Sequence, residues 1–303
     1  MDRAAPPARV DPPAGEPKTE LWLRVKEAIL SLPVYFSAPE IRIAGVRATE
    51  IFTLAAALEA AVEEQVVATL NRMRQVWDPT DRFPLLTFVR QPQTFPDVLL
   101  RYPAGGEIML GIELKGWYLL AKEGEPTFRY KETPAVCTPW DLLIVVLWYL
   151  SDVISGSPRL LTPFIESARY AAEYRNYWWR EVRDTEDSRE IRSPVDVTPY
   201  PQKSDRILDH AETDPGGNFG IIARTEIIDP YVKQMLGEQI AGIPARYWMG
   251  FFSIFKESPD SAEIVSALDR MGRRAGRGKE SKLQALAKDL VARVVSALRN
   301  HEG

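Results

Sequence analysis

Three charged residues near the middle of the chain have the types and spacing needed for phosphodiester chemistry. Asp97 follows a proline in the segment FPDVLL, and Glu113 and Lys115 stand two residues apart in GIELKG, beyond a Pro-Ala-Gly-Gly turn. In a β-strand, residues i and i+2 point to the same face, so Glu113 and Lys115 share a face while Ile112 and Leu114 point into the core. If the two segments pair as neighbouring strands, Asp97 approaches Glu113.

Two carboxylates and a lysine on one polar face suit Mg²⁺-dependent hydrolysis. Asp97, Glu113 and the main-chain carbonyl of Leu114 offer hard oxygen ligands of the kind that Mg²⁺ prefers. A metal ion held by them would polarise a phosphate group and activate water. Lys115 would orient the attacking water or stabilise the charge that develops on the phosphate.

A long helix is expected to precede these residues and to position them. Residues 49–77 carry apolar side chains at helical spacing, with Thr49 as a candidate N-cap and Asp78 at the stop. An additional acid from this helix fits the same scheme. Glu63 borders the apolar stripe and is our first choice for this auxiliary catalytic role, with Glu59 next.

Strands are predicted after this helix, on either side of a crossover. Three short runs rich in strand-forming residues predict consecutive, mostly antiparallel strands at 83–89, 95–102 and 107–115. The apolar run at 142–150 is far shorter than the ~20 residues that span a bilayer, and it predicts a strand buried on both faces. Residues 163–183 predict an aromatic, arginine-bearing helix. This order of elements is typical of an α/β sandwich.

Asp97, Glu113 and Lys115, placed after a long helix, resemble the motif of the PD-(D/E)XK nuclease superfamily, which includes type II restriction endonucleases. The resemblance covers the motif core, from about residue 49 to residue 150. It implies a restriction-endonuclease-like three-layer α/β sandwich, in which helices flank a central mixed sheet. It also implies Mg²⁺-dependent cleavage of double-stranded DNA, with Asp97 and Glu113 as metal ligands and Lys115 as the catalytic lysine.

Within this superfamily, the chain is most similar to a type II restriction endonuclease. Its 303 residues contain no Walker motif and no methyltransferase glycine motif, which suits an autonomous DNA-cleaving enzyme. Such enzymes commonly act as homodimers, so we expect a homodimer. One alternative is a structure-selective or defence-system nuclease without a short recognition site. Another is a non-catalytic DNA-binding or assembly module of the same fold.

The plainest alternative for the motif is a surface aspartate beside a cross-strand Glu–Lys pair. Two glycines favour the nuclease interpretation over this one. Gly111 and Gly116 flank the Glu-Leu-Lys segment, and a residue without a side chain admits close approach of neighbouring groups.

Five residues are candidates for contacts with DNA. The predicted helix at 163–183 interleaves arginines with aromatic residues, a pattern that can clamp phosphates or stack on unpaired bases. Packing of a core helix explains the same pattern and is our preferred interpretation. The glycine-rich segment at 214–220 and the charged residues before it could enter a DNA groove. The candidates are Arg169, Arg175, Lys203, Arg206 and Asn218.

The composition limits the other possibilities. A net charge of −4 argues against a polybasic binder of DNA or membranes. The single cysteine, Cys137, excludes an internal disulfide and a Cys-ligated zinc site, and it points to a cytoplasmic protein. His210 and His301 leave little room for histidine metal sites. We expect a disordered proline-rich arm over 1–20, a nuclease domain over 21–256, and a basic linker with a C-terminal helix over 257–303.

Overall fold

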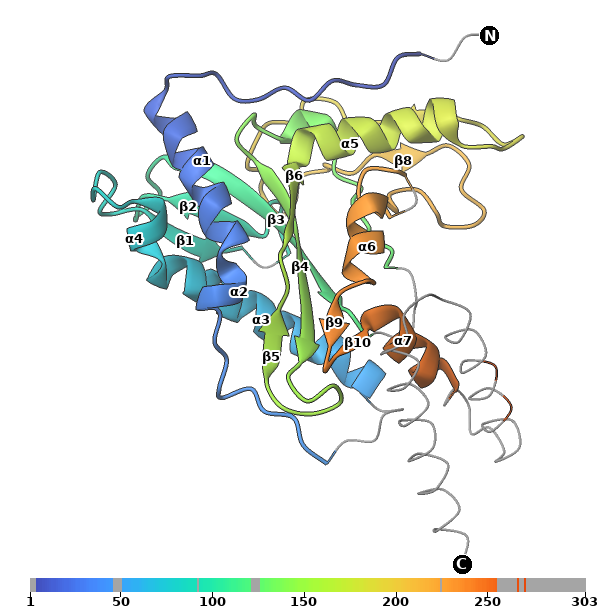
Figure 1. Cartoon of the computed structure of the whole chain (residues 1–303). Helices are drawn as coiled ribbons and strands as arrows, with labels where there is room; N and C mark the ends of the chain where they lie inside the picture. Colours follow the sequence, from blue (N-terminus) through green and yellow to red (C-terminus); the bar gives the residue numbers. More distant parts are fainter. Residues whose placement is uncertain are drawn as a thin grey trace, which may run out of the picture.

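The computed structural model of the chain describes residues 4–45, 51–91, 93–120, 126–223 and 225–254, together with Ser266 and Arg270. Its centre is a curled mixed β-sheet (Figure 1). In the described residues the sheet order is β1-β2-β3-β4-β5, and β6 also pairs with β4. The strands are β1 (Thr87–Arg90), β2 (Val98–Arg101), β3 (Ile108–Tyr118), β4 (Leu142–Leu150), β5 (Pro158–Leu160) and β6 (Phe164–Ser167).

The strands run in the predicted directions, with antiparallel strands first and a crossover strand after them. The first three strands form an antiparallel meander, and β4 then lies parallel to β3 with Ile112 opposite Leu142. β4 has the predicted limits, and all of its residues except Tyr149 are buried. This burial confirms that the apolar run is a strand covered on both faces. β5 and β6 both pair antiparallel to β4 along different parts of its length.

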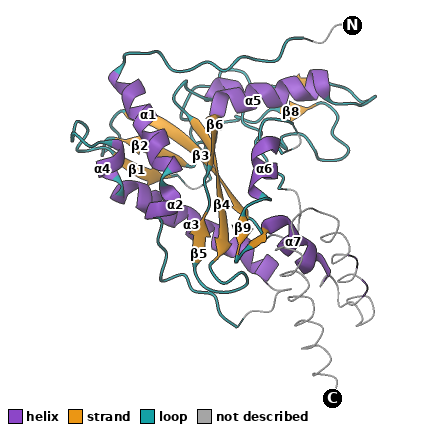
Figure 2. Cartoon of the chain, viewed as in Figure 1, coloured by secondary structure: helices purple, strands orange, loops and turns teal. Residues whose placement is uncertain are grey.

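Helices lie around this sheet (Figure 2). α1 packs against α4, α3 packs against β1 and β3, and α5 contacts β4 and β6. Two small antiparallel ribbons, β7–β8 and β10–β9, lie beyond α5 in the sequence. The helices are α1 (Pro17–Leu30), α2 (Leu32–Tyr35), α3 (Ile51–Arg72), α4 (Arg74–Trp77), α5 (Ala168–Tyr177), α6 (Asp229–Met235) and α7 (Ala245–Ile254). The short elements are the 3₁₀ turn η1 (Pro134–Val136), the π-helical turn η2 (Trp178–Val182), β7 (Ile191–Arg192), β8 (His210–Ala211), β9 (Gln239–Ile240) and β10 (Ile243–Pro244).

Element limits differ from the predictions at several points. The helix expected at 163–183 is wrong at its start, because residues 164–167 form β6 against β4. Ser167 then caps α5, and its hydroxyl oxygen accepts the Tyr170 N–H at 3.2 Å. The helix expected at 49–77 is divided at Met73 into α3 and α4. Its proposed cap, Thr49, lies outside the described residues.

The N-terminal segment has a defined path in the structure. Residues 4–16 run without helix toward α1, which begins at Pro17, inside the segment for which disorder is expected. Arg9 pairs with Glu166 of β6 at 3.0 Å, and its guanidinium lies 4.5 Å from the Tyr170 ring centroid. The predicted basic linker and C-terminal helix at 257–303 lie outside the described residues, apart from the two isolated positions. Among the helices described, none is both long and apolar enough to cross a membrane.

Candidate active site

The β2–β3 pairing brings Asp97 and Glu113 together, as their spacing predicts. Val98 lies opposite Ile112, so Asp97, one residue earlier, stands at the end of β2 opposite Glu113. The Leu114 N–H donates to Asp97 Oδ2 at 2.9 Å, which fixes the orientation of that carboxylate. Because the N–H and C=O of one strand residue point to the same side, the Leu114 carbonyl also faces the Asp97 side of β3.

Gly111 makes room for the Pro96-Asp97 dipeptide. A Cβ atom at Gly111 would lie only 2.3 Å from Pro96 Cγ and 2.9 Å from Asp141 Oδ1. The Gly111 N–H donates to that same Asp141 oxygen at 2.7 Å. The close approach expected of this glycine is therefore confirmed, and its neighbours are Pro96, which directly precedes Asp97, and Asp141.

Asp97 and Glu113 line one cavity of about 320 Å³. Glu132, from the connection between β3 and β4, lines the same cavity, and so does Lys203, from the loop between β7 and β8. The Lys203 ammonium donates to Gln93 Oε1 at 2.6 Å, which joins two walls of the cavity. The site therefore has carboxylates on one side and a lysine on another.

Lys115 is bound to Glu113 by an ion pair in which Nζ and Oε1 are 2.5 Å apart. Burial raises the pKa of Glu113; the charge of Lys115 opposes this rise, and the charge of Asp97 adds to it. Burial alone would lower the pKa of Lys115, but attraction to Glu113 and Glu132 outweighs it, and the net pKa is raised. Lys115 is therefore a cation at neutral pH.

Glu63, the predicted auxiliary acid, is paired with a cation of β1. Its Oε2 atom accepts from Arg90 Nη2 at 2.5 Å, and Glu63 is not among the residues that line the cavity. Burial raises its pKa while Arg90 lowers it, and the charges of Asp97 and Lys115 also act on it. Glu63 thus lies near the motif residues but is held by Arg90.

Glu59 approaches β3 from the face opposite that of Glu113 and Lys115. A Cβ atom at Gly116 would lie 2.3 Å from Glu59 Oε1, so only glycine leaves space for this carboxyl. The Gly116 N–H donates to the Glu59 carboxyl group. Burial, with a further contribution from the charge of Glu63, raises the pKa of Glu59 to about 7.

The donor set suits a cation that needs few protein ligands. In the part of the chain that the structure describes, no group of three or more His, Cys, Asp or Glu side chains is arranged to hold a metal ion. Asp97 and Glu113 offer two carboxylates, each with one oxygen engaged by Leu114 or Lys115. The buried Glu132 Oε2 has no hydrogen-bond partner within the described protein. A buried oxygen without a partner fits a bound water or ion.

Arg175 cannot contact DNA, and its inclusion among the DNA-binding candidates is wrong. Only 2% of its side chain is exposed, because it lies on the inner face of α5. Its guanidinium donates to the carbonyl oxygens of Tyr130 and Glu132 and to Asp209 Oδ2 at 2.6 Å. For this residue the packing interpretation is confirmed.

The other candidates for DNA contact lie at the surface. Arg169 has a half-exposed side chain and pairs with Glu173 one helical turn away at 2.9 Å. Arg206 and Asn218 are exposed, and Lys203 is the member of the group that lines the Asp97–Glu113 cavity.

Sequence reasoning missed Glu132. It stands in the segment YKETP, where no motif or periodicity distinguishes it, and only the fold brings it to the cavity. Glu132 forms an isolated β-bridge with Leu208, which also lines the cavity. An acidic residue in the crossover after the motif is the one signal that could have indicated it.

Comparisons of the chain with protein-family models, with curated proteins and with solved structures find no match. What the protein does must therefore be inferred from its own residues. The arrangement of Asp97, Glu113 and Lys115 is the feature from which that inference starts.

Proposed function

We propose that this protein is a Mg²⁺-dependent endonuclease that hydrolyses phosphodiester bonds in double-stranded DNA, as type II restriction enzymes do. The observation that carries the proposal is the convergence of Asp97 and Glu113 on one cavity, with Lys115 bonded to Glu113. A mixed sheet with helices around it is compatible with the restriction-endonuclease-like sandwich that we propose as the fold.

Asp97 and Glu113 are suited to Mg²⁺. This ion is usually held by one or two carboxylates, with water and substrate phosphate completing the octahedron. Two carboxylates and the Leu114 carbonyl meet that need without a third acidic ligand. Bound there, Mg²⁺ would act as a Lewis acid on the scissile phosphate. The free oxygen of Glu132 would accept a hydrogen bond from a water molecule in the cavity.

The two lysines bind and stabilise the phosphate groups. Lys115 does not itself line the cavity, but it is held beside Glu113 as a cation, so its charge would stabilise phosphate oxygens as their negative charge grows in the transition state. Lys203 lies on another wall, where its only partner among the described side chains is the neutral Gln93. Its charge is therefore free to hold a phosphate and to position the backbone of the nucleic acid.

The test is cleavage of unmethylated phage and plasmid DNA with Mg²⁺ or with EDTA. We expect discrete Mg²⁺-dependent fragments from the wild-type protein and from Lys233→Ala, a control at an exposed lysine of α6. Asp97→Asn and Lys115→Ala should give no fragments while their circular dichroism spectra remain those of the wild type. Cleavage by both Asp97→Asn and Glu113→Gln would overturn the assignment.

The products also separate the alternatives. Discrete bands indicate a recognition sequence, whereas a smear indicates a nuclease without one that shares the same site. DNA binding without cleavage of duplex, junction or RNA substrates would indicate a non-catalytic module. A homodimer, which we propose because two strands must be cut, would appear as twice the chain mass in light scattering.

A further inference from the structure

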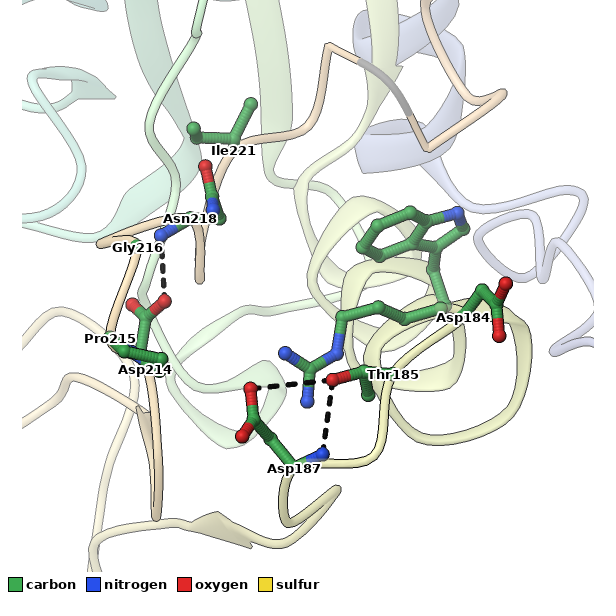
Figure 3. A pocket seen from close by; sticks show the side chains of 10 residues that line it. Asp184, Thr185, Asp187, Asp214, Pro215, Gly216, Asn218 and Ile221 are labelled. Carbon is green, nitrogen blue, oxygen red and sulfur yellow. Dashed lines mark hydrogen bonds between the residues drawn. The ribbon is translucent and has the colours of Figure 1, made fainter.

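A second cavity, of about 380 Å³, lies between the end of α5 and the glycine-rich loop (Figure 3). One wall is formed by Trp178 and Arg183 of the α5–η2 end and by the turn at 184–187. The other wall is the loop at 214–221, including Asn218. The structure thus joins two features of the sequence, the aromatic arginine-bearing helix and the DPGGNFG segment, that the proposed cleavage site does not use.

A buried ring contact and several hydrogen bonds hold both walls in place within the protein itself. Trp179 and Phe219, which adjoin the two walls in the sequence, pack edge to face with ring centroids 5.1 Å apart at 86°. The Asp214 carboxylate accepts the backbone N–H groups of Asn218 and Phe219 at 2.7 and 3.0 Å. Arg129 donates to the Gly217 carbonyl at 2.9 Å. Binding of a ligand would therefore cost little conformational entropy in this site.

The lining calls for a ligand that has both acceptors and donors. Arg183 stacks on Trp179 at 3.6 Å, and its Nε–H is buried with no hydrogen-bond partner among the described residues, so it requires an acceptor. The Asp187 carboxylate accepts from the Thr185 hydroxyl at 3.3 Å and keeps further acceptor capacity, so a ligand with N–H donors would pair there. Trp178 adds a partly exposed indole.

A nucleobase has this combination of properties. It is flat, its edge alternates donors and acceptors, and its faces stack on indole rings. The lining residues carry more aspartates than arginines, which disfavours a phosphate inside the cavity. A volume of about 380 Å³ is also at the lower end of the range for small-ligand pockets.

The two cavities are neighbours along one segment of chain. Arg129 forms an isolated bridge with Ile221, which lines the second cavity, and Glu132 bridges Leu208, which lines the first. Three extended residues span roughly 10 Å, so only a few nucleotides would separate the two sites. We propose that the second cavity holds one unstacked nucleobase of the strand whose backbone occupies the Asp97–Glu113 site, an inference that rests on the proposed nuclease function.

The test uses a short duplex that carries one unpaired 2-aminopurine in a bulge, with the fully paired duplex for comparison. Binding is measured by fluorescence anisotropy, and stacking by quenching of 2-aminopurine, both in EDTA so that no cleavage occurs. We expect Trp178→Ala to weaken binding of the bulged duplex by about 5- to 150-fold and to abolish the quenching, because base–aromatic stacking is lost. Affinity for the paired duplex should fall much less, because the cost of unpairing its base offsets the stacking.

Two further variants serve as a control and as an independent test. Tyr177→Ala removes the neighbouring half-buried aromatic ring, which does not line the cavity, and should bind as the wild type does. Gly216→Leu fills the cavity without removing the indole, since a Cβ atom there meets only the end of the Asn218 side chain. Gly216→Leu should also abolish the quenching, even if Trp178→Ala proves unstable.

The outcomes separate this proposal from the nuclease proposal. Unchanged quenching in both Trp178→Ala and Gly216→Leu would overturn the nucleobase site, even if the wild type cleaves DNA. Equal losses on bulged and paired duplexes would overturn it too. Quenching that persists in Asp97→Asn supports the nucleobase site. If the wild type quenches 2-aminopurine but cleaves no DNA, the nucleobase site is supported and the proposed nuclease function is contradicted.

Discussion

Arg175 and Asp209 form an ion pair that is almost completely removed from solvent. The exposed fractions of their side chains are 2% and 0%, and Nη2 and Oδ2 lie 2.6 Å apart. Asn176 donates to the same Asp209 oxygen at 2.8 Å, while Asp209 Oδ1 is buried without a partner among the described residues. Arg175 also binds the carbonyl of Glu132, so the pair helps to hold a residue that lines the candidate site.

Removal of one partner should therefore be costly. We expect Arg175→Met to lower the free energy of unfolding by about 3–5 kcal/mol, because the Asp209 carboxylate is left charged and buried. The double variant Arg175→Met/Asp209→Leu should recover much of this loss. Urea unfolding followed by circular dichroism measures both, with Arg169→Met as the exposed control that changes stability by only about 0.5 kcal/mol. A loss below about 1 kcal/mol in Arg175→Met would contradict the buried-pair assignment.

For single residues, the sequence predicts which side chains lie close together along a strand better than it predicts which side chains are buried. Asp97, Glu113 and Lys115 were found from the two-residue period of a strand and from one turn, which are local features. Arg175 was misjudged because which face of a helix is inside depends on the sheet that covers it. Glu132 was missed because its place in the cavity depends on a bridge to Leu208, far along the chain.

The packing of α3 on β3 includes the contact between Glu59 and Gly116. Burial raises the pKa of Glu59 to about 7 from its ordinary value of 4.5, so the folded protein favours the protonated carboxyl. Its stabilising contribution is complete below about pH 4.5 and is lost as the pH rises through 7. The wild-type free energy of unfolding should therefore fall over this interval through Glu59.

The variant Glu59→Gln should lack this dependence. An amide is always neutral, and its oxygen still accepts the Gly116 N–H, so the variant should gain stability relative to the wild type between pH 4.5 and pH 8. Urea midpoints at several pH values measure the difference. Glu64→Gln, an exposed position on the same helix, should follow the wild-type profile. Parallel profiles for Glu59→Gln and the wild type would show that Glu59 titrates normally in the fold.

Elements were predicted well where hydrophobic pattern alone decides them. β4 has the limits of its apolar run, and the long amphipathic helix is present as α3 and α4. The pattern failed at residues 164–167, because pairing with the open edge of β4 outweighs the helical preference of the segment. The limits of the N-terminal arm also differ: α1 begins at Pro17, inside the segment 1–20 for which disorder is expected, at a proline suited to a first helical turn.

The whole molecule brings together loops that are far apart in the sequence. The mixture of parallel and antiparallel strands in the sheet follows from the order of elements along the chain. The cavity walls, in contrast, come from residues 93–95, Glu132 and residues 201–208. No periodicity in the sequence specifies where such loops meet, so the walls that these loops contribute to the cavity could not be predicted. Of the residues singled out in those loops, Lys203 is the cation that the fold brings to the carboxylates.

This placement matters because the chain as a whole is acidic. A net charge of −4 supplies no attractive field for DNA, so binding must depend on a few local cations. Each lysine that neutralises a phosphate releases counterions, and this makes the slope of log K against log salt steeper by about 0.9. Lys203→Ala should therefore weaken duplex binding and reduce the slope by about 0.9. The effect should be similar for all sequences, because a phosphate contact carries no base information.

Anisotropy titrations of a labelled duplex at several salt concentrations, in EDTA, measure this slope. Lys233→Ala, an exposed lysine on α6 away from the cavity, removes the same charge from the protein and should leave the slope unchanged. The comparison separates a contact at the site from a general change in net charge, since both variants have the same total charge. Equal slopes for wild type and Lys203→Ala would mean that DNA does not reach this wall of the cavity. The cavity would then be too remote from the bound backbone for Asp97 and Glu113 to act on it.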